Sequence, residues 1–189
     1  SALQRIGEGK NLEKINEKAK QELVELEEKI ERAPTEHDEM QWRLIRLGKK
    51  AKVDVWVPQN DQGKSFEGHN FREEVLHDFQ ETLDVPVYVK NIDVVWKFGF
   101  SIKSAFEIEH STSVYSGILR LSDLRALTPN STYPMFIVAD RDRRSKVFAE
   151  LKRPTFDNPY LNLKEAIGFL SYDKIRELVT QKAPPHLIR

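Results

Sequence analysis

The first hydrophobic pattern along the chain is a narrow stripe near its start. Over residues 11–33 an apolar side chain recurs every three or four positions between Glu, Lys, Gln and Asn, which predicts one long amphipathic helix. The stripe consists of Leu12, Ile15, Ala19, Leu23, Leu26, Ile30 and Ala33. Such a stripe is typical of a connector to another domain or of a dimerisation seam, and the sequence leaves both possibilities open.

After Pro34 the pattern changes to short elements of both kinds. Thr35 has the character of a helix N-cap, and it precedes a segment with helical spacing. Alternating or continuous apolar runs predict strands at 53–57, 85–98, 102–109 and 134–139. Helical spacing predicts helices at 36–50, 70–82, 113–127, 140–151 and 172–181, and residues 166–170 form a further short apolar piece.

The order of these elements predicts the fold class. Three neighbouring strands without a crossover favour antiparallel pairing, and the strand after the intervening helix favours a parallel addition by a right-handed crossover. We therefore expect an α/β fold, a mixed β-sheet flanked by helices, preceded by the long N-terminal helix. The predicted domains are a helix or linker at 1–33, a catalytic-type domain at 34–182 and a tail at 183–189.

Composition narrows the picture in a few respects. The chain of 189 residues has 30 basic and 30 acidic residues, so any nucleic-acid binding must come from a local basic face. The lack of cysteine excludes a disulfide scaffold, a thiolate zinc site and a cysteine nucleophile. No membrane-spanning run or signal peptide is evident, and we expect a cytoplasmic protein. The start at Ser1, without Met, leads us to expect a piece of a longer protein with an upstream domain.

Three carboxylates form the most informative pattern in the sequence. Glu107 and Glu109 lie two apart in one predicted strand and so share a face, and Asp93 lies in the preceding strand, which can bring it level with them. Like charges this close repel, and a hard divalent cation such as Mg²⁺ is their natural partner. The alternative is that both glutamates simply face solvent on a half-exposed strand.

In these residues the sequence resembles the PD-(D/E)XK nuclease superfamily, the restriction-endonuclease-like fold. Ile92-Asp93 stands for the Pro-Asp of that family, and Glu107-Ile108-Glu109 stands for its (Asp/Glu)-x-Lys. The resemblance covers residues 35 to 140, and it departs from the family where Glu109 replaces the lysine. It implies Mg²⁺- or Mn²⁺-dependent phosphodiester hydrolysis, with the metal held by Asp93, Glu107 and the backbone carbonyl of Ile108, and with Glu109 as a second metal ligand or as a base that orients the attacking water.

The helix that begins after Thr35 supplies further candidates. The resemblance implies that Glu36, in its first turn, adds a catalytic acid, while the alternative is an acidic residue that favours the helix dipole. His37 and Gln41 share one helix face and could point to the same cleft, although we expect both to face solvent. His110 should lie on the strand face opposite Glu109, so we expect no ligand role for it.

A basic segment offers a surface for DNA. Residues 141–153 carry six Lys or Arg side chains against two acids, and the preceding predicted helix adds Arg120 and Arg125. The alternative is a helix face that is simply solvated. The predicted phosphate contacts are Arg120, Arg143, Arg144 and Lys146. The leading hypothesis is thus a Mg²⁺-dependent DNA endonuclease domain, possible as a homodimer, of a restriction- or defence-type protein from a bacterium or archaeon. The alternatives are an inactive nuclease-like module that binds DNA or protein, and a partner-binding domain with solvent-facing acids.

Overall fold

The structure is a computed structural model that describes residues 16–23, 34–79, 87–110 and 114–182. The chain forms two compact units, which meet in the sequence between Pro34 and Thr35. Residues 16–23 of the first unit are helical, as predicted. The rest of the predicted helix at 11–33, which includes most of its apolar stripe, and the predicted tail at 183–189 lie outside the described residues.

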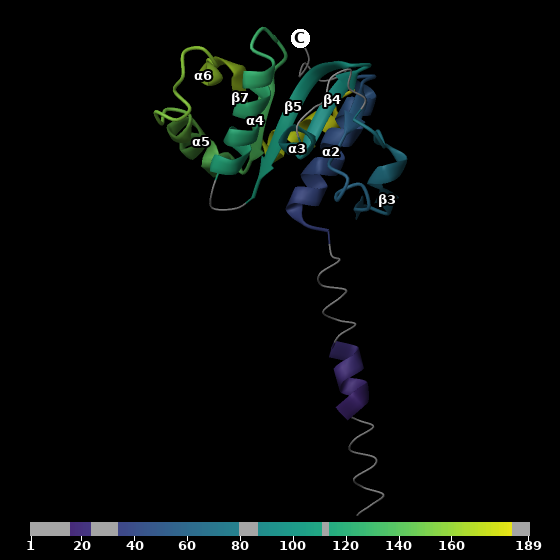
Figure 1. Ribbon diagram of the computed structural model, residues 1–189. Coiled ribbons are helices and arrows are strands. Elements are labelled where there is room, and N and C mark those ends of the chain that lie inside the picture. The colour runs from purple at the N-terminus through teal and green to yellow at the C-terminus, as the bar shows by residue number, and fades with distance from the viewer. Residues whose placement is uncertain (1–15, 24–33, 80–86, 111–113, 183–189) are drawn as a thin grey trace, which may run out of the picture. The chain divides into compact units, whose positions relative to one another are not determined.

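The second unit is built on a five-stranded sheet with the order β1-β4-β5-β6-β7 (Figure 1). Its strands are β1 (Asp54–Trp56), β4 (Val94–Phe98), β5 (Ser101–Glu109), β6 (Met135–Ala139) and β7 (Ile167–Ser171). Strands β1, β4 and β5 pair antiparallel, whereas β6 and β7 are added parallel to β5. This mixed sheet confirms the predicted fold class, including the change from antiparallel to parallel pairing at β5.

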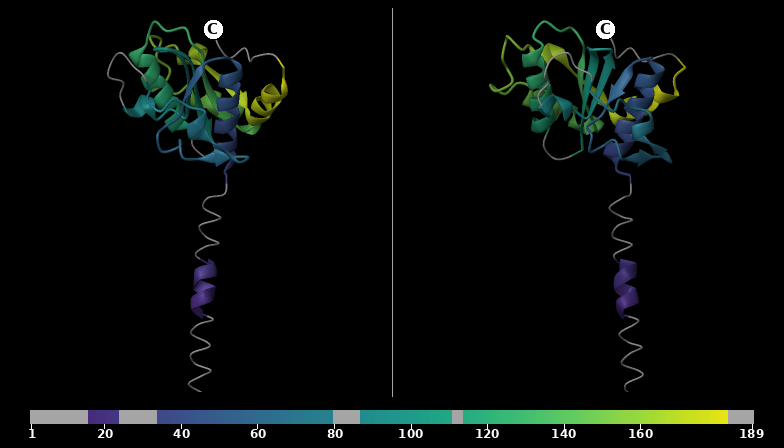
Figure 2. Two further views of the ribbon diagram at one scale, coloured as in Figure 1. Left: turned by 90° about the vertical axis from the view of Figure 1, so that its right-hand side faces the viewer. Right: turned by 45° about the vertical axis from the view of Figure 1, so that its right-hand side comes forward.

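Helices cover both faces of the sheet, as the views in Figure 2 show. The helices are α2 (Glu36–Lys50), α3 (Val87–Lys90), α4 (Tyr115–Leu127), α5 (Arg144–Glu150), α6 (Leu163–Ala166) and α7 (Tyr172–Thr180), with 3-10 turns η1 (Phe71–Glu73) and η2 (Arg141–Arg143). Among the described residues, none of the helices combines the length and the apolar character that a membrane crossing requires.

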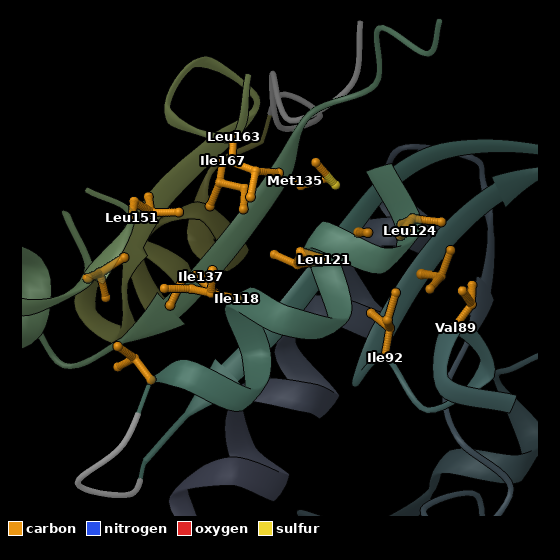
Figure 3. Close-up of a cluster of buried hydrophobic side chains, with 14 of the residues drawn as sticks. Val89, Ile92, Ile118, Leu121, Leu124, Met135, Ile137, Leu151, Leu163 and Ile167 are labelled. Carbon is orange, nitrogen blue, oxygen red and sulfur yellow. The ribbon is translucent and has the colours of Figure 1, made fainter. Parts of the chain in front are cut away.

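The alternation of side chains along the strands separates two apolar cores. Phe106 and Ile108 of β5 lie in the core beneath α2 and α7, whereas Ala105 lies in the core beneath α4. Figure 3 shows Ile118 and Leu121 of α4 in this second core, where they meet Ile137 of β6 and its neighbours. The parity of β5 therefore directs Glu107 and Glu109 toward α4.

Helix α2 begins where the sequence predicts. The Thr35 hydroxyl accepts a hydrogen bond from the Asp38 amide, and the Asp38 carboxylate accepts one from the Thr35 amide. This reciprocal capping box satisfies two amides that the start of a helix otherwise leaves unpaired. It fixes the first turn of α2, which contributes to the site described below.

The structure differs from the sequence predictions in four places. The predicted strand at 85–98 is wrong in its first half: residues 87–90 form α3, whose Val89 is buried beneath α4, and the strand begins only at Val94. The helix predicted at 70–82 is reduced to η1 in its described part, and residues 80–82 lie outside that part. The apolar piece at 166–170 is the edge strand β7. A small hairpin of β2 (Ser65–Phe66) and β3 (His69–Asn70) was not predicted, because its strands are too short to show alternation.

Helices α2 and α7 are joined by an ion pair that makes stability depend on pH. The Arg176 guanidinium donates to both carboxylate oxygens of Glu39, at 2.9 Å each, and Arg43 donates to one of them. Hydrogen bonds from Arg176 first, and then from Arg43, lower the pKa of Glu39 from 4.5 to about 2. Since the folded-state pKa is lowered, the pair stabilises the fold fully above pH 4.5 and loses this effect as pH falls toward 2.

We expect Arg176→Ala to lower the free energy of unfolding at pH 7 by about 1 kcal/mol. The gap between this variant and the wild type should narrow at pH 3, because Glu39 then contributes less to the wild type. Urea unfolding of the wild type and of Arg176→Ala at pH 7 and pH 3 measures this difference in the free energy of unfolding. Lys174→Ala is the matched control, because Lys174 pairs with Glu177 on the exposed side of the same helix. A gap that is as wide at pH 3 as at pH 7 would contradict the prediction.

Candidate active site

The predicted acids meet at one end of the sheet. Asp93 directly precedes β4, and Glu109 is the last residue of β5. Because β6 and β7 run parallel to β5, their last residues Ala139 and Ser171 lie in register with Glu109 at the same edge. Helices α2, α4 and α7 also start at this edge. Ligand sites of α/β sheets usually open where parallel strands end in this way.

Asp93 and Glu107 lie side by side on neighbouring strands. Val94 pairs with Phe106, and the same antiparallel register places Asp93 opposite Glu107. The Asp93 carboxylate is held in place by the amide of Ile108, which donates to Oδ2 at 2.7 Å. The sequence prediction that adjacent strands bring these acids level is therefore met by the register of the sheet.

Glu107 is fully buried and is paired with Arg120 of α4. The guanidinium donates to both carboxylate oxygens, from Nε at 2.8 Å and from Nη2 at 2.5 Å. Burial is the main cause that raises the pKa of Glu107 well above its usual value, and the negative charge of Asp93 raises it further, while Arg120 opposes both. The ion pair thus balances a carboxylate that is otherwise costly to keep charged.

Glu109 caps the start of α4. Its Oε1 accepts a hydrogen bond from the Gly117 amide at 2.9 Å, and the phenol of Tyr172 donates to its backbone carbonyl at 2.9 Å. Burial raises the pKa of Glu109, and the Gly117 hydrogen bond opposes this. A side chain at Gly117 would overlap Glu109 Oε1 and lie 3.2 Å from the Glu107 Cβ, so only glycine lets α4 approach the two acids this closely.

Two side chains of α2 complete the arrangement, which corrects the prediction that both face solvent. His37 Nε2 lies 3.5 Å from Asp93 Oδ2. Gln41 is fully buried and donates to the carbonyl of Asp93 at 2.8 Å and to Asp61 Oδ2 at 3.0 Å. The first turns of α2 pack over the start of β4, so the face that spacing alone assigned to solvent is covered by the turn that carries Asp61.

Beside Gln41 lies a small charged group. Lys64 Nζ is 2.9 Å from Asp38 Oδ1 and 2.8 Å from Asp61 Oδ1, so its charge is shared by two acids. Burial counteracts these acids, but together they raise the pKa of Lys64. His110 packs edge-on against His37, with ring centroids 5.5 Å apart. The His110 ring therefore packs against the same imidazole that faces Asp93.

Glu36, in contrast, is directed to a different partner. Its carboxylate is half-exposed and lies 3.2 Å from the Arg176 guanidinium of α7. Helix α2 contacts Asp93 through His37 and Gln41, so it does contribute to the acidic site, but through residues other than the predicted acid. A catalytic role for Glu36 remains a prediction, and its observed contacts favour the structural alternative.

Residues 16–187 match the family described as the C-terminal domain of the type II restriction enzyme NmeDI. The chain belongs to this family. The type II restriction enzyme NmeDI from Neisseria meningitidis serogroup C is 29% identical over 166 residues, which cover 78% of this chain and 45% of the relative. The chain thus spans less than half the length of that relative. The search of solved structures gave no match.

In the structure, the predicted DNA contacts have different surroundings. Arg120 is directed inward to Glu107, and a phosphate contact by Arg120 stays a prediction. Arg144 is exposed and lies over the ring of Phe148, with its guanidinium carbon 4.9 Å from the centroid. Lys146 is exposed on the same helix. Arg143 lies at the acidic edge, directly after β6.

The acids of this family member fit a divalent cation only in part. Among the described residues, no group of three His, Cys, Asp or Glu side chains is arranged as a metal site. The predicted triad is divided: Glu107 pairs with Arg120, Glu109 caps α4, and Asp93 accepts from Ile108. Asp93 and Glu107 are nevertheless adjacent oxygen donors whose negative charges repel each other. In the structure the Arg120 guanidinium supplies the positive charge that balances them. They suit a hard cation once Arg120 leaves Glu107.

Proposed function

We propose that this domain is a Mg²⁺- or Mn²⁺-dependent DNA endonuclease of the PD-(D/E)XK type. The observation that carries the proposal is the pairing of Asp93 with Glu107 on neighbouring strands, at the sheet edge where parallel strands end. The restriction-enzyme family supports it from an independent direction. The DNA substrate, a second copy of the chain and a further domain remain part of this proposal.

Each residue then has a defined task. Asp93 and Glu107 would hold the metal, which polarises the phosphate and lowers the pKa of bound water when it is present. Ile108 N–H fixes the Asp93 carboxylate, and Gln41 fixes the Asp93 backbone from the other side. Glu109, which is 5% exposed, would orient the attacking water as a base.

A second candidate function is an inactive module that binds DNA. The ion pair of Glu107 with Arg120 favours it, because an arginine that permanently replaces the cation would leave no metal site. The capping role of Glu109 favours it too, since that role gives the residue a structural reason to be present. The two candidates differ in whether the chain cleaves DNA.

The test is cleavage of supercoiled plasmid and of a long phage genome, which contains short target sequences by chance. The wild type should nick or cut with Mg²⁺ or Mn²⁺ and stop with a chelator, while Asp93→Asn and Glu107→Gln should lose activity by a factor on the order of a thousand. Asp54→Asn is the matched control, because Asp54 is an exposed acid on β1. Cleavage that persists in both site variants would place the reaction elsewhere. A wild type that binds but never cuts would favour the binding module.

A further inference from the structure

The inference that follows rests on the proposed function. Hydrolysis of a phosphodiester gathers negative charge on the phosphate oxygens in the transition state, and a fixed cation stabilises that charge. Where the PD-(D/E)XK superfamily that the sequence resembles has lysine, this chain has Glu109. A carboxylate cannot stabilise negative charge on a phosphate. The domain therefore needs a cation from another element.

Two of the cations near the acids are already engaged. Lys64 lies between Asp38 and Asp61, at 2.9 and 2.8 Å, on the far side of Gln41. Arg120 gives two hydrogen bonds to the buried carboxylate of Glu107. Lys64 cannot reach a phosphate without giving up both of its acids, and Arg120 is available to a phosphate only after a metal has displaced it from Glu107.

Arg143 is in a different position. Its Nη1 is buried and, within the described part of the chain, has no hydrogen-bond partner. A buried N–H of a charged group without an acceptor is unfavourable, and such groups usually find an acceptor in a ligand, an ion or ordered water. Arg143 Nη1 is therefore a donor that a bound phosphate oxygen could satisfy.

The backbone brings Arg143 to the acids. It ends η2, which starts directly after β6, and the side chain of Asp140 caps this turn by accepting from the Asp142 amide. The last residue of β6, Ala139, is in register with Glu109. The positive charge of Arg143 also acts on two groups at this edge, lowering the pKa of Glu109 and of Tyr172 against the larger effect of burial.

We propose that Arg143 is a catalytic residue that donates to the scissile phosphate and supplies the charge that the lysine supplies elsewhere in the superfamily. In the reaction, the water oxygen forms a bond to phosphorus, the bond from phosphorus to the leaving sugar oxygen breaks, and the proton released by the water passes to a base. Arg143 exchanges no proton. Its part is to hold a non-bridging oxygen while negative charge develops there.

The experiment compares Arg143→Ala and Arg143→Lys with Arg46→Ala, a change of an exposed arginine on α2. Single-turnover cleavage is measured at saturating enzyme, and duplex affinity is measured separately with Ca²⁺ in place of Mg²⁺. Arg143→Ala should slow the cleavage step by a factor on the order of a hundred to a thousand. Its affinity for the duplex should fall far less, and its thermal midpoint should stay near that of the wild type, because the side chain has no hydrogen bond on Nη1 to lose.

Added guanidinium ion provides a readout that a structural role would not move. It should partly restore cleavage to Arg143→Ala and leave Asp93→Asn inactive. If Arg143→Ala is unfolded, the slower cleavage of folded Arg143→Lys carries the test, because lysine keeps the charge but loses the second donor. Cleavage by Arg143→Ala at the rate of Arg46→Ala, with Asp93→Asn inactive, would overturn the proposal. Weaker binding of the duplex by Arg143→Ala, with an unchanged rate of the cleavage step, would also overturn the proposal. A wild type that cannot cleave would overturn the proposed function and this role with it.

Discussion

Arg120→Ala is expected to lower the free energy of unfolding at pH 8 by about 3 to 5 kcal/mol, the range for removing one partner of a buried ion pair. Glu107 would remain fully buried without the arginine that donates to both of its carboxylate oxygens, next to the charge of Asp93. The variant can escape part of this cost by protonating Glu107. Urea unfolding monitored by circular dichroism measures the change.

The pH dependence of this variant has a defined sign. Burial already raises the folded-state pKa of Glu107 above its unfolded value, and loss of Arg120 raises it further. An acid whose pKa is raised in the folded state destabilises the fold least when it is protonated. The free energy of unfolding of Arg120→Ala should therefore increase as pH falls from 8 to 5. The difference in free energy of unfolding between Arg120→Ala and the wild type should be widest at high pH.

A double-mutant cycle separates the ion pair from the rest of the site. Glu107→Gln should cost about 1 kcal/mol, less than Arg120→Ala, because Arg120 is partly exposed and can turn to water. The double variant should be more stable than Arg120→Ala alone, since no buried charge is then left unpaired. Equal stability of Arg120→Ala and wild type at pH 8 would show that the pair carries no such energy.

The second large effect concerns Glu109. If it orients the attacking water, Glu109→Gln should slow cleavage by a factor on the order of a hundred, as for a lost general base. The glutamine oxygen can still accept from the Gly117 amide, so the start of α4 is kept and stability should change by less than about 0.5 kcal/mol. Single-turnover cleavage and thermal unfolding are measured on the same preparations.

Glu109→Ala is the matched comparison, because it removes both the base and the cap. It should lose as much cleavage as Glu109→Gln and, in addition, about 1 kcal/mol of stability from the uncapped start of α4. If Glu109→Gln cleaves like the wild type while Glu109→Ala is destabilised, Glu109 is a helix cap alone. That result would leave Asp93 and Glu107 as the acids of the site.

Local patterns in the sequence were enough for most elements and for part of the site. The capping residue Thr35, the strand at 102–109 and the helix at 113–127 follow from spacing and residue type, which act over a few residues. The period of two along a strand also placed Glu107 and Glu109 on one face. Residues 87–90 and 166–170 were harder, because a short apolar run fits a helix or a strand equally well until its neighbours are known.

What each charged group meets was decided by tertiary structure. Spacing placed Arg120 on α4, but only the packing of α4 against β5, made possible by Gly117, turns it onto Glu107. In the same way, the contact of α2 with the start of β4 brings His37 and Gln41 to Asp93, and Glu36 is directed to Arg176. Residue type and spacing determine which chemical groups an element carries and on which side, whereas their partners come from elements distant in sequence. The distances and the burial that set charge and pKa exist only once those elements have packed together.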